Sequence, residues 1–292
     1  MTNSNQLVHR GNGAAGAVAL PAGQRVRPTF GWSDIWKAPL HDFPLRDEIL
    51  YQFLPLSASM KLLEIGPGSG FTAFRLARRV RQLTLVEVGT EATAELRERF
   101  RETRNIRVVC ADATQLSFAD MLQDEFDTAF CLDVFEYVVD PAVFLRNVAA
   151  VLRPGGEIFL SYPNVPPPAG DGMTCFSRLA QLEGLLAAAG FHDWQIFAVR
   201  LRRNAAAVYG LLHEWPLRLY RWLRRRERIG LPQTYEATWA FRHGRRLLRY
   251  KVPLHLLWLL LGAGLRLGGP VFSAEPATDG ILGRQLVIRA WR

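Results

Sequence analysis

A glycine-rich segment stands between a short apolar run and a stretch with helical spacing in the first third of the sequence. Residues 62–70 read L-L-E-I-G-P-G-S-G, so Glu64 precedes three alternating glycines, Gly66, Gly68 and Gly70. Glycines at such a turn let the backbone bend tightly and approach a ligand closely, because no Cβ is in the way. The proline inside the loop removes an N–H that a pyrophosphate cradle would use, and no phosphate-loop lysine follows. The spacing therefore predicts either a ligand-binding loop outside the G-x-G-x-x-G class or a structural strand-to-helix turn.

Acidic residues also close the next three apolar runs. Glu87 ends the second run, Asp112 with Ala113 follows the third, and Leu132 with Asp133 ends the fourth. The carboxylate after the second run is placed to hydrogen-bond two ribose hydroxyls, and the one after the third could meet the amino group of a base. A helix cap explains each acid equally well when it is taken alone. Their order along the chain favours a ligand that contains a nucleoside.

Alternating strands and helices form the frame that must position these residues. The predicted strands are 61–65, 83–88, 106–110, 126–132, 157–161, 194–199 and 281–291. The predicted helices are 46–54, one running to residue 80, 91–101, 141–152 and 183–189. This alternation is typical of βαβ units, so the sequence predicts an α/β fold with a parallel sheet covered by helices on both faces.

On these motifs the chain resembles the class I S-adenosylmethionine (AdoMet)-dependent methyltransferases, and among them the small-molecule, quinone and glycan O-methyltransferases. The resemblance covers about residues 45–200 and the last strand. It implies a Rossmann-like, seven-stranded, mostly parallel sheet with a helical insertion before the last strand. It also implies transfer of a methyl group from AdoMet, most often to oxygen, on a small hydrophobic or lipid-linked acceptor.

The resemblance further implies a set of cofactor-binding residues. They are Glu64, Gly66, Gly68, Gly70, Glu87, Asp112, Ala113 and Leu132. The glycine loop would wrap the methionine part of AdoMet, with Glu64 at its ammonium group. Glu87 would hold the ribose, Asp112 and Ala113 would lie at the adenine, and the segment around Leu132 would flank the methyl group. Carboxylates suit these roles because AdoMet is a cation.

The acceptor must lose one proton during methyl transfer, and Asp133 and Glu136 are the candidate catalytic residues after the fourth strand. Helix capping explains them equally well. Many quinone-type relatives have Glu-His where this chain has Glu136 and Tyr137. Tyrosine is a poor metal ligand here, so no metal site is expected. Further possible bases are the histidines at positions 41, 213, 243 and 255, each of which is better explained by a surface or packing role.

Charge divides the 292-residue chain unevenly. The chain has 36 basic and 27 acidic residues, a net charge of +9, whereas the segment 200–266 holds 15 basic and three acidic residues, or +12, which leaves −3 for the remainder. The predicted parts are a mobile N-terminal tail (1–28), an AdoMet-binding core (29–204), a basic and aromatic helical insertion (205–280) and a final core strand (281–292).

The insertion contains basic helical faces at 215–228 and 242–249, several tryptophans, and an uncharged run at 252–265 whose 14 residues are too few to span a bilayer. These features favour an element that lies on an anionic membrane surface. A helical lid with solvated arginines and an RNA-binding surface are the alternatives.

Compartment and function class follow from what the sequence lacks. Three cysteines without a CxxC pair argue against disulfides and zinc and favour a reducing compartment, and no signal peptide is recognised. We therefore expect a cytoplasmic enzyme, peripheral at the inner face of the cell membrane. An RNA methyltransferase and a catalytically silent AdoMet-binding partner protein are the alternative functions. The absence of an Asn-Pro-Pro-Tyr-like motif after the fourth strand disfavours methylation of nucleic-acid bases.

Overall fold

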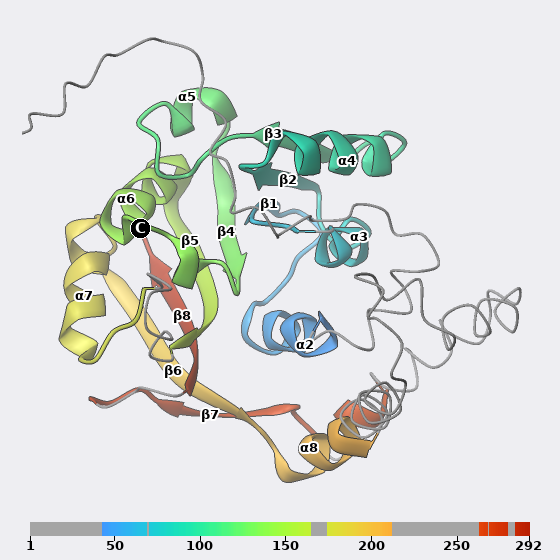
Figure 1. Ribbon diagram of the computed structural model, residues 1–292, viewed down its shortest axis with the longest axis vertical. Coiled ribbons are helices and arrows are strands. Elements are labelled where there is room, and N and C mark those ends of the chain that lie inside the picture. The colour runs from blue at the N-terminus through green and yellow to red at the C-terminus, as the bar shows by residue number, and fades with distance from the viewer. Residues whose placement is uncertain (1–42, 69, 165–173, 212–262, 268, 280–283) are drawn as a thin grey trace, which may run out of the picture.

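A single eight-stranded sheet forms the centre of the molecule in the computed structural model (Figure 1). The structure describes residues 43–68, 70–164, 174–211, 263–267, 269–279 and 284–292. The strand order is β3-β2-β1-β4-β5-β8-β6-β7. The strands are β1 (Lys61–Ile65), β2 (Gln82–Glu87), β3 (Ile106–Cys110), β4 (Phe126–Leu132), β5 (Leu152–Asn164), β6 (Asp193–Leu201), β7 (Phe272–Pro276) and β8 (Arg284–Trp291). The first five strands pair in parallel, whereas β8 is antiparallel to both β5 and β6.

Helices cover both faces of this sheet, as the sequence predicts. They are α2 (Phe43–Phe53), α3 (Phe71–Leu76), α4 (Thr90–Phe100), α5 (Phe118–Leu122), α6 (Pro141–Val151), α7 (Leu179–Ala188) and α8 (Arg203–Tyr209), with a short 3-10 helix η2 (Phe135–Tyr137). One core packs α5, α6 and α7 on the sheet, and a second core packs α2, α3, α4 and α8 on the opposite face. The neighbouring residues Leu62 and Leu63 are both fully buried but belong to different cores. This two-sided burial explains why the strands read as continuous apolar runs.

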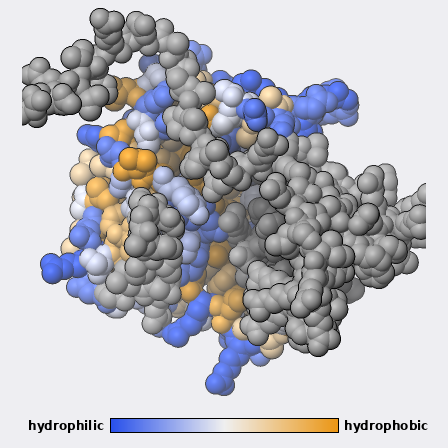
Figure 2. Space-filling model, viewed as in Figure 1, coloured by the Kyte–Doolittle hydropathy of each residue, from blue (hydrophilic) through white to orange (hydrophobic). Residues whose placement is uncertain are grey.

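The surface of the described part is mixed rather than uniformly polar. In Figure 2 hydrophilic side chains project at its margins, while hydrophobic ones show between them nearer the middle of the view. Some large apolar side chains are exposed, among them Leu116 (92%) and Val139 (94%). Single exposed apolar residues of this kind are common on folded proteins and mark no site by themselves.

Three strands, at 61–65, 106–110 and 126–132, have the bounds that the sequence predicts. The strand count differs, since the sheet has eight strands rather than seven. The additional strand is β7, which pairs antiparallel with β6 at the edge of the sheet. It lies inside the segment 205–280 that we expected to be helical, and that expectation is wrong there. Only Phe272 of its five residues is buried, so its sequence shows no apolar alternation.

Most of the predicted insertion lies outside the described residues. This applies to the helical faces at 215–228 and 242–249 and to most of the uncharged run 252–265, of which 263–265 are helical. The predicted N-terminal tail 1–28 also falls outside them. None of the helices that the structure describes is long and apolar enough to cross a membrane.

The direction of the strand order reverses between β1 and β4, the two neighbouring strands at the centre of the parallel part of the sheet. β1 pairs with β2 on one side and with β4 on the other, so the connections after β1 and β4 run apart at the carboxyl edge of the sheet. In open α/β sheets, ligands bind in the crevice at such a switch point. The glycine loop follows β1 at this edge.

Candidate functional site

The glycine loop after β1 has a backbone that only glycine adopts easily. Gly66, Gly68 and Gly70 have φ angles of +71°, +53° and +73°. A Cβ on Gly66 would lie 2.6 Å from the Val134 side chain, and one on Gly70 would lie 2.7 Å from the Phe100 ring. None of the described residues comes within 4 Å of a Cβ on Gly68. Close packing therefore requires the outer two glycines, while no described residue crowds the middle one.

The predicted strand-end residues meet at this same edge. The Gly66 N–H donates to the Val86 carbonyl at 2.9 Å, and the Ala111 N–H donates to the Glu87 carbonyl at 3.1 Å. The segment after β4 also reaches the loop, because the Val134 side chain packs directly against Gly66. The ends of β1, β2, β3 and β4 thus form one continuous rim, as parallel pairing predicts.

Glu64 is a buried carboxylate at the start of this rim. Its side chain is 4% exposed, and its Oε2 atom has no hydrogen-bond partner among the described residues. Burial raises the pKa of Glu64 to about 8, with a smaller contribution from the nearby carboxylate of Asp47. A buried oxygen without a donor is costly. A cationic donor that reached Glu64 would remove this cost and favour the ionised form.

Helix α2 holds the glycine loop from the outside, a contact that the sequence patterns did not predict. Asp47 is completely buried and accepts hydrogen bonds from the Thr72 hydroxyl at 2.9 Å and from the Arg75 guanidinium at 2.5 Å. Both donors belong to α3, the helix that the loop enters. Burial raises the pKa of Asp47, and Arg75 opposes this rise. Asp47 stands in a predicted helix without any distinctive spacing, so no signal in the sequence marks it.

The other predicted cofactor residues lie along the rim. Glu87 is half-buried, its Oε1 accepts from the backbone N–H two residues on at 3.1 Å, and burial raises its pKa. Asp112 accepts from the Thr114 N–H at 2.8 Å and from the Thr114 hydroxyl at 2.7 Å, so one of its oxygens stabilises a local turn. Ala113 and Leu132 are buried beside these acids. The structure therefore brings all the predicted residues to one edge.

β4 ends at a residue with an unusual backbone. Asp133 has a φ of +51°, and its N–H donates to the Ser161 carbonyl at 2.6 Å. The side-chain amide of Gln285 donates to Asp133 Oδ1 at 3.0 Å and to Ser161 Oγ at 2.9 Å. Three strands, β4, β5 and β8, thus fix this carboxylate. Sequence reasoning identified Asp133 but missed Ser161 and Gln285, which come from distant parts of the chain.

Glu136 lies in η2 and is only 2% exposed, whereas Asp133 is half-buried. Burial raises the pKa of the Cys131 thiol, and the carboxylates of Glu136, Asp133 and Glu64 raise it further. All three acids therefore lie within electrostatic reach of one buried thiol. This arrangement gathers acidic groups between the glycine loop and the end of β4, and a cationic ligand there would favour their ionised forms.

Helix capping does not account for the two candidate catalytic acids. The N-cap of α6, the next helix, is Asp140, whose Oδ1 accepts from the Val143 N–H at 3.0 Å. Within the ranges described, no group of three or more His, Cys, Asp or Glu side chains could hold a metal ion. The four histidines considered as bases, at positions 41, 213, 243 and 255, lie outside the described residues.

Comparison with known proteins agrees with this geometry. Residues 63–160 match a family model described as a methyltransferase domain. On this match the chain is similar to the class I methyltransferases. The ubiquinone biosynthesis O-methyltransferase of Alkalilimnicola ehrlichii is 32% identical to this chain over 161 residues, which are 54% of this chain and 63% of the relative. The protein of the same name from Stutzerimonas stutzeri is 31% identical over 132 residues, 45% of this chain and 56% of the relative.

The match thus spans less than two thirds of these curated relatives. Among solved structures, phosphoethanolamine N-methyltransferase 2 of Haemonchus contortus in complex with S-adenosyl-L-methionine has a TM-score of 0.51 and 14% sequence identity. That likeness covers 89% of this chain and 56% of the other. It shows that the two chains share a fold.

Proposed function

We propose that this protein is an AdoMet-dependent methyltransferase that methylates an oxygen atom of a small, hydrophobic or lipid-linked acceptor of the quinone type. The buried carboxylate of Glu64, beside a loop with three left-handed glycines, is the observation that carries this proposal. The names of the curated relatives support oxygen as the methylated atom and a quinone-type acceptor.

The residues at the rim fit AdoMet. Gly68 leaves room for the methionine part to pass, and Glu64 offers a buried oxygen without a donor to its ammonium group. Glu87 stands at the end of β2, where a carboxylate can accept from ribose hydroxyls. When bound, AdoMet supplies the electrophilic methyl group. The acids around the rim keep the site favourable for a cation.

Asp133 is the residue we propose to contact the acceptor hydroxyl. Its half-buried side chain is reachable, and Gln285 and Ser161 fix its position. Transfer requires the acceptor oxygen to lie in line with the methyl group at about 3 Å and to lose its proton. The carboxylate of Asp133 can accept that proton. Glu136 is more deeply buried, so we propose that it does not touch the acceptor and that its carboxylate stabilises the cationic cofactor electrostatically.

Titration calorimetry with AdoMet tests the cofactor site. Gly68→Asp would place a side chain in the open space of the loop, and Glu87→Ala would remove a hydrogen-bond acceptor. Bonds to a charged group are worth about 1.5 to 3 kcal/mol, so Glu87→Ala should weaken binding about tenfold or more. Gly155→Asp is the matched control, since Gly155 also has a positive φ (+73°) with nothing within 4 Å of a Cβ, but lies at the start of β5. Unchanged affinity in both loop and ribose variants would refute the proposal.

Transfer of a labelled methyl group tests the acceptor class. The purified protein is incubated with labelled AdoMet and, in parallel, with a catechol, a membrane lipid extract or total RNA. Label in the catechol or lipid extract supports the proposed function. Label in RNA would favour the RNA methyltransferase, and cofactor binding without transfer to any acceptor would favour the silent partner protein.

A further inference from the structure

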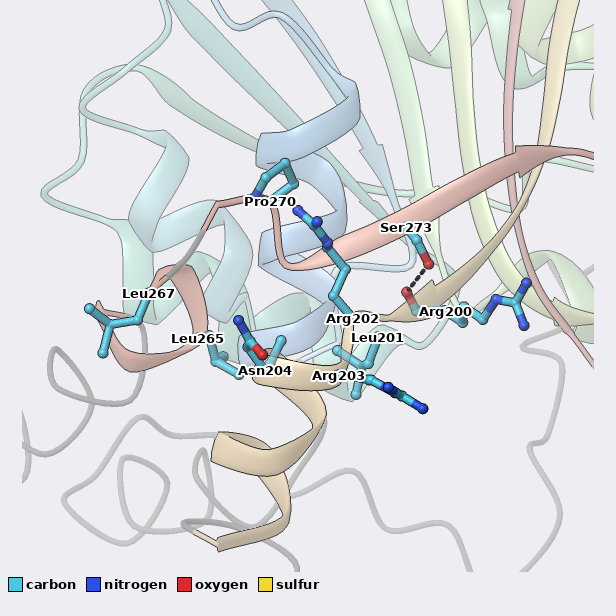
Figure 3. Close-up of a pocket in the computed structure, with 10 residues that line it drawn as sticks. Arg200, Leu201, Arg202, Arg203, Asn204, Leu265, Leu267, Pro270 and Ser273 are labelled. Carbon is cyan, nitrogen blue, oxygen red and sulfur yellow. Dashed lines mark hydrogen bonds between the residues drawn. The ribbon is translucent and has the colours of Figure 1, made fainter.

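A cavity with a volume of about 440 Å³ opens where β6 runs into α8, at the far end of the carboxyl edge of the sheet (Figure 3). This volume lies within the range of small-molecule sites. β5 and β8 separate β6 from β4 in the sheet, so the cavity is distinct from the candidate cofactor site. Leu265, Leu267, Pro270 and Ser273, from the described parts of the segment 265–273, form its opposite wall. Nothing in the proposed methyl transfer uses this place.

The polar part of the cavity is strongly basic. Arg200, Arg202 and Arg203 line it, together with the neutral residues Asn204 and Ser273, and none of the described lining residues is a carboxylate. In Figure 3 Arg202 extends toward the 265–273 wall, whereas Arg200 and Arg203 extend on the other side of the strand end. Arg202 is therefore the arginine that faces this wall, and Arg200 and Arg203 add positive charge on the other side of the strand end.

These arginines have little local compensation from acids. Arg200 forms an ion pair with Glu275 at 3.0 Å, but both side chains are exposed, and such pairs contribute about 1 kcal/mol or less. No carboxylate in the part of the chain that the structure describes forms an ion pair with Arg202 or Arg203. Guanidinium groups bind phosphate through two parallel hydrogen bonds. The excess positive charge thus favours a phosphate group as ligand.

The remaining wall of the cavity is apolar. Leu265 is buried, Pro270 is exposed, and Leu267 is 70% exposed at the opening. Arginines beside an exposed leucine suit a ligand that joins a phosphate to hydrocarbon, because one molecule can then satisfy both kinds of surface. A sugar phosphate has no hydrocarbon part that could pack on the leucines of the 265–273 wall.

Long-range contacts hold this wall in place. Arg266 donates to both carboxylate oxygens of Glu48, at 2.8 and 2.6 Å. The side-chain amide of Gln52 donates to the Phe272 carbonyl at 2.8 Å and accepts from the Phe272 N–H at 2.9 Å. Both partners belong to α2, so the wall is anchored before any ligand arrives. A preformed cavity lowers the entropic cost of binding.

We propose that this cavity binds the phosphate group of an amphiphile, with Arg202 on the phosphate, Arg200 and Arg203 adding positive charge at the strand end, and the 265–273 wall on its hydrocarbon. The phosphate can belong to an anionic phospholipid in a bilayer or to a dispersed phosphorylated lipid-like molecule. If the phosphate belongs to a bilayer, this cavity is one of the places where the protein touches the membrane. It would then add to the membrane contact predicted for the basic insertion 205–280. This inference does not depend on methyl transfer.

The test uses the full chain and two probes. Hexyl phosphate is titrated by calorimetry, and vesicles of phosphatidylcholine with or without phosphatidylglycerol are tested by sedimentation. The variant R202Q/R203Q removes two cavity charges, and the matched control R78Q/R104Q removes two exposed arginine charges elsewhere. Loss of charge-assisted hydrogen bonds should weaken binding about tenfold or more in R202Q/R203Q. The control should stay within about twofold of the wild type, since general charge screening changes equally in both variants.

Each outcome decides the proposal. Binding of hexyl phosphate that R202Q/R203Q weakens, with or without vesicle binding, supports a dispersed phosphorylated ligand. Binding to phosphatidylglycerol vesicles alone, again weakened only in the cavity variant, supports a bilayer headgroup. Equal losses in the two variants, or no binding of either probe, would overturn the proposal. So would tighter binding of a single-stranded RNA oligonucleotide that the cavity variant abolishes, because the arginines would then contact nucleic acid.

Discussion

The affinity for AdoMet should rise with pH up to about 8, because Glu64 must lose its proton before it can pair with the ammonium group of the ligand. Burial raises the pKa of Glu64 to about 8 from an ordinary value of 4.5. The protein without ligand therefore carries a protonated Glu64 at neutral pH. Below pH 8, each pH unit should cost about a factor of ten in affinity, or about 1.4 kcal/mol.

The same shift predicts how the stability of the ligand-free protein depends on pH. Between about 4.5 and about 8 the native state binds a proton at Glu64 that the unfolded state has released. The free energy of unfolding should therefore fall as pH rises through this window, by about 1.4 kcal/mol per unit, and the contribution is fully present only below 4.5. Saturating AdoMet should reduce this slope, since it binds the ionised form.

Calorimetry across this pH range, repeated in buffers of different ionisation enthalpy, measures both the affinity and the released proton. Glu64→Gln keeps the shape of the side chain and removes its titration, so its affinity should be lower at pH 8 and nearly independent of pH. Glu98→Gln, an exposed acid on α4, is the control and should behave as the wild type does. A wild-type slope that survives in Glu64→Gln would refute this role of Glu64.

Single contacts lead to three more expected outcomes. Gly70→Ala should destabilise the fold by about 1 to 3 kcal/mol, measured by urea unfolding, because its backbone is left-handed and a Cβ would lie 2.7 Å from Phe100; an unchanged midpoint would contradict this. Gln285→Ala should lower kcat about tenfold and leave AdoMet affinity unchanged, since Asp133 loses the hydrogen bond from Gln285; equal losses in both would indicate a structural defect instead. Turnover should be unchanged by EDTA, because Tyr137 replaces the histidine of metal-using relatives, and rescue of an EDTA-treated enzyme by magnesium would contradict it.

Local patterns in the sequence predicted the central sheet well, because strands buried on both faces are uninterrupted apolar runs. β1 and β4 illustrate this, since nearly all their residues are buried, and the acids at the strand ends mark the rim of the site. β7 was missed because an exposed edge strand buries only one residue and leaves no periodic pattern. The place of β7 is set by backbone pairing with β6 and by a hydrogen bond from the side-chain amide of Gln52 to the Phe272 carbonyl. These two residues lie 220 positions apart in the sequence. Such a contact has no local signature.

The residues that position the site are harder to predict than those that line it. Motif spacing identified Glu64 and Asp133 because each follows from its place at the end of a strand. The groups that set their chemistry, Asp47 beside the first and Gln285 on the second, come from α2 and β8. Both elements flank the methyltransferase motifs in sequence, and α2 also anchors the wall of the arginine-lined cavity through its bonds to residues 266 and 272. One helix therefore contacts both α3, which follows the glycine loop, and the wall of the cavity.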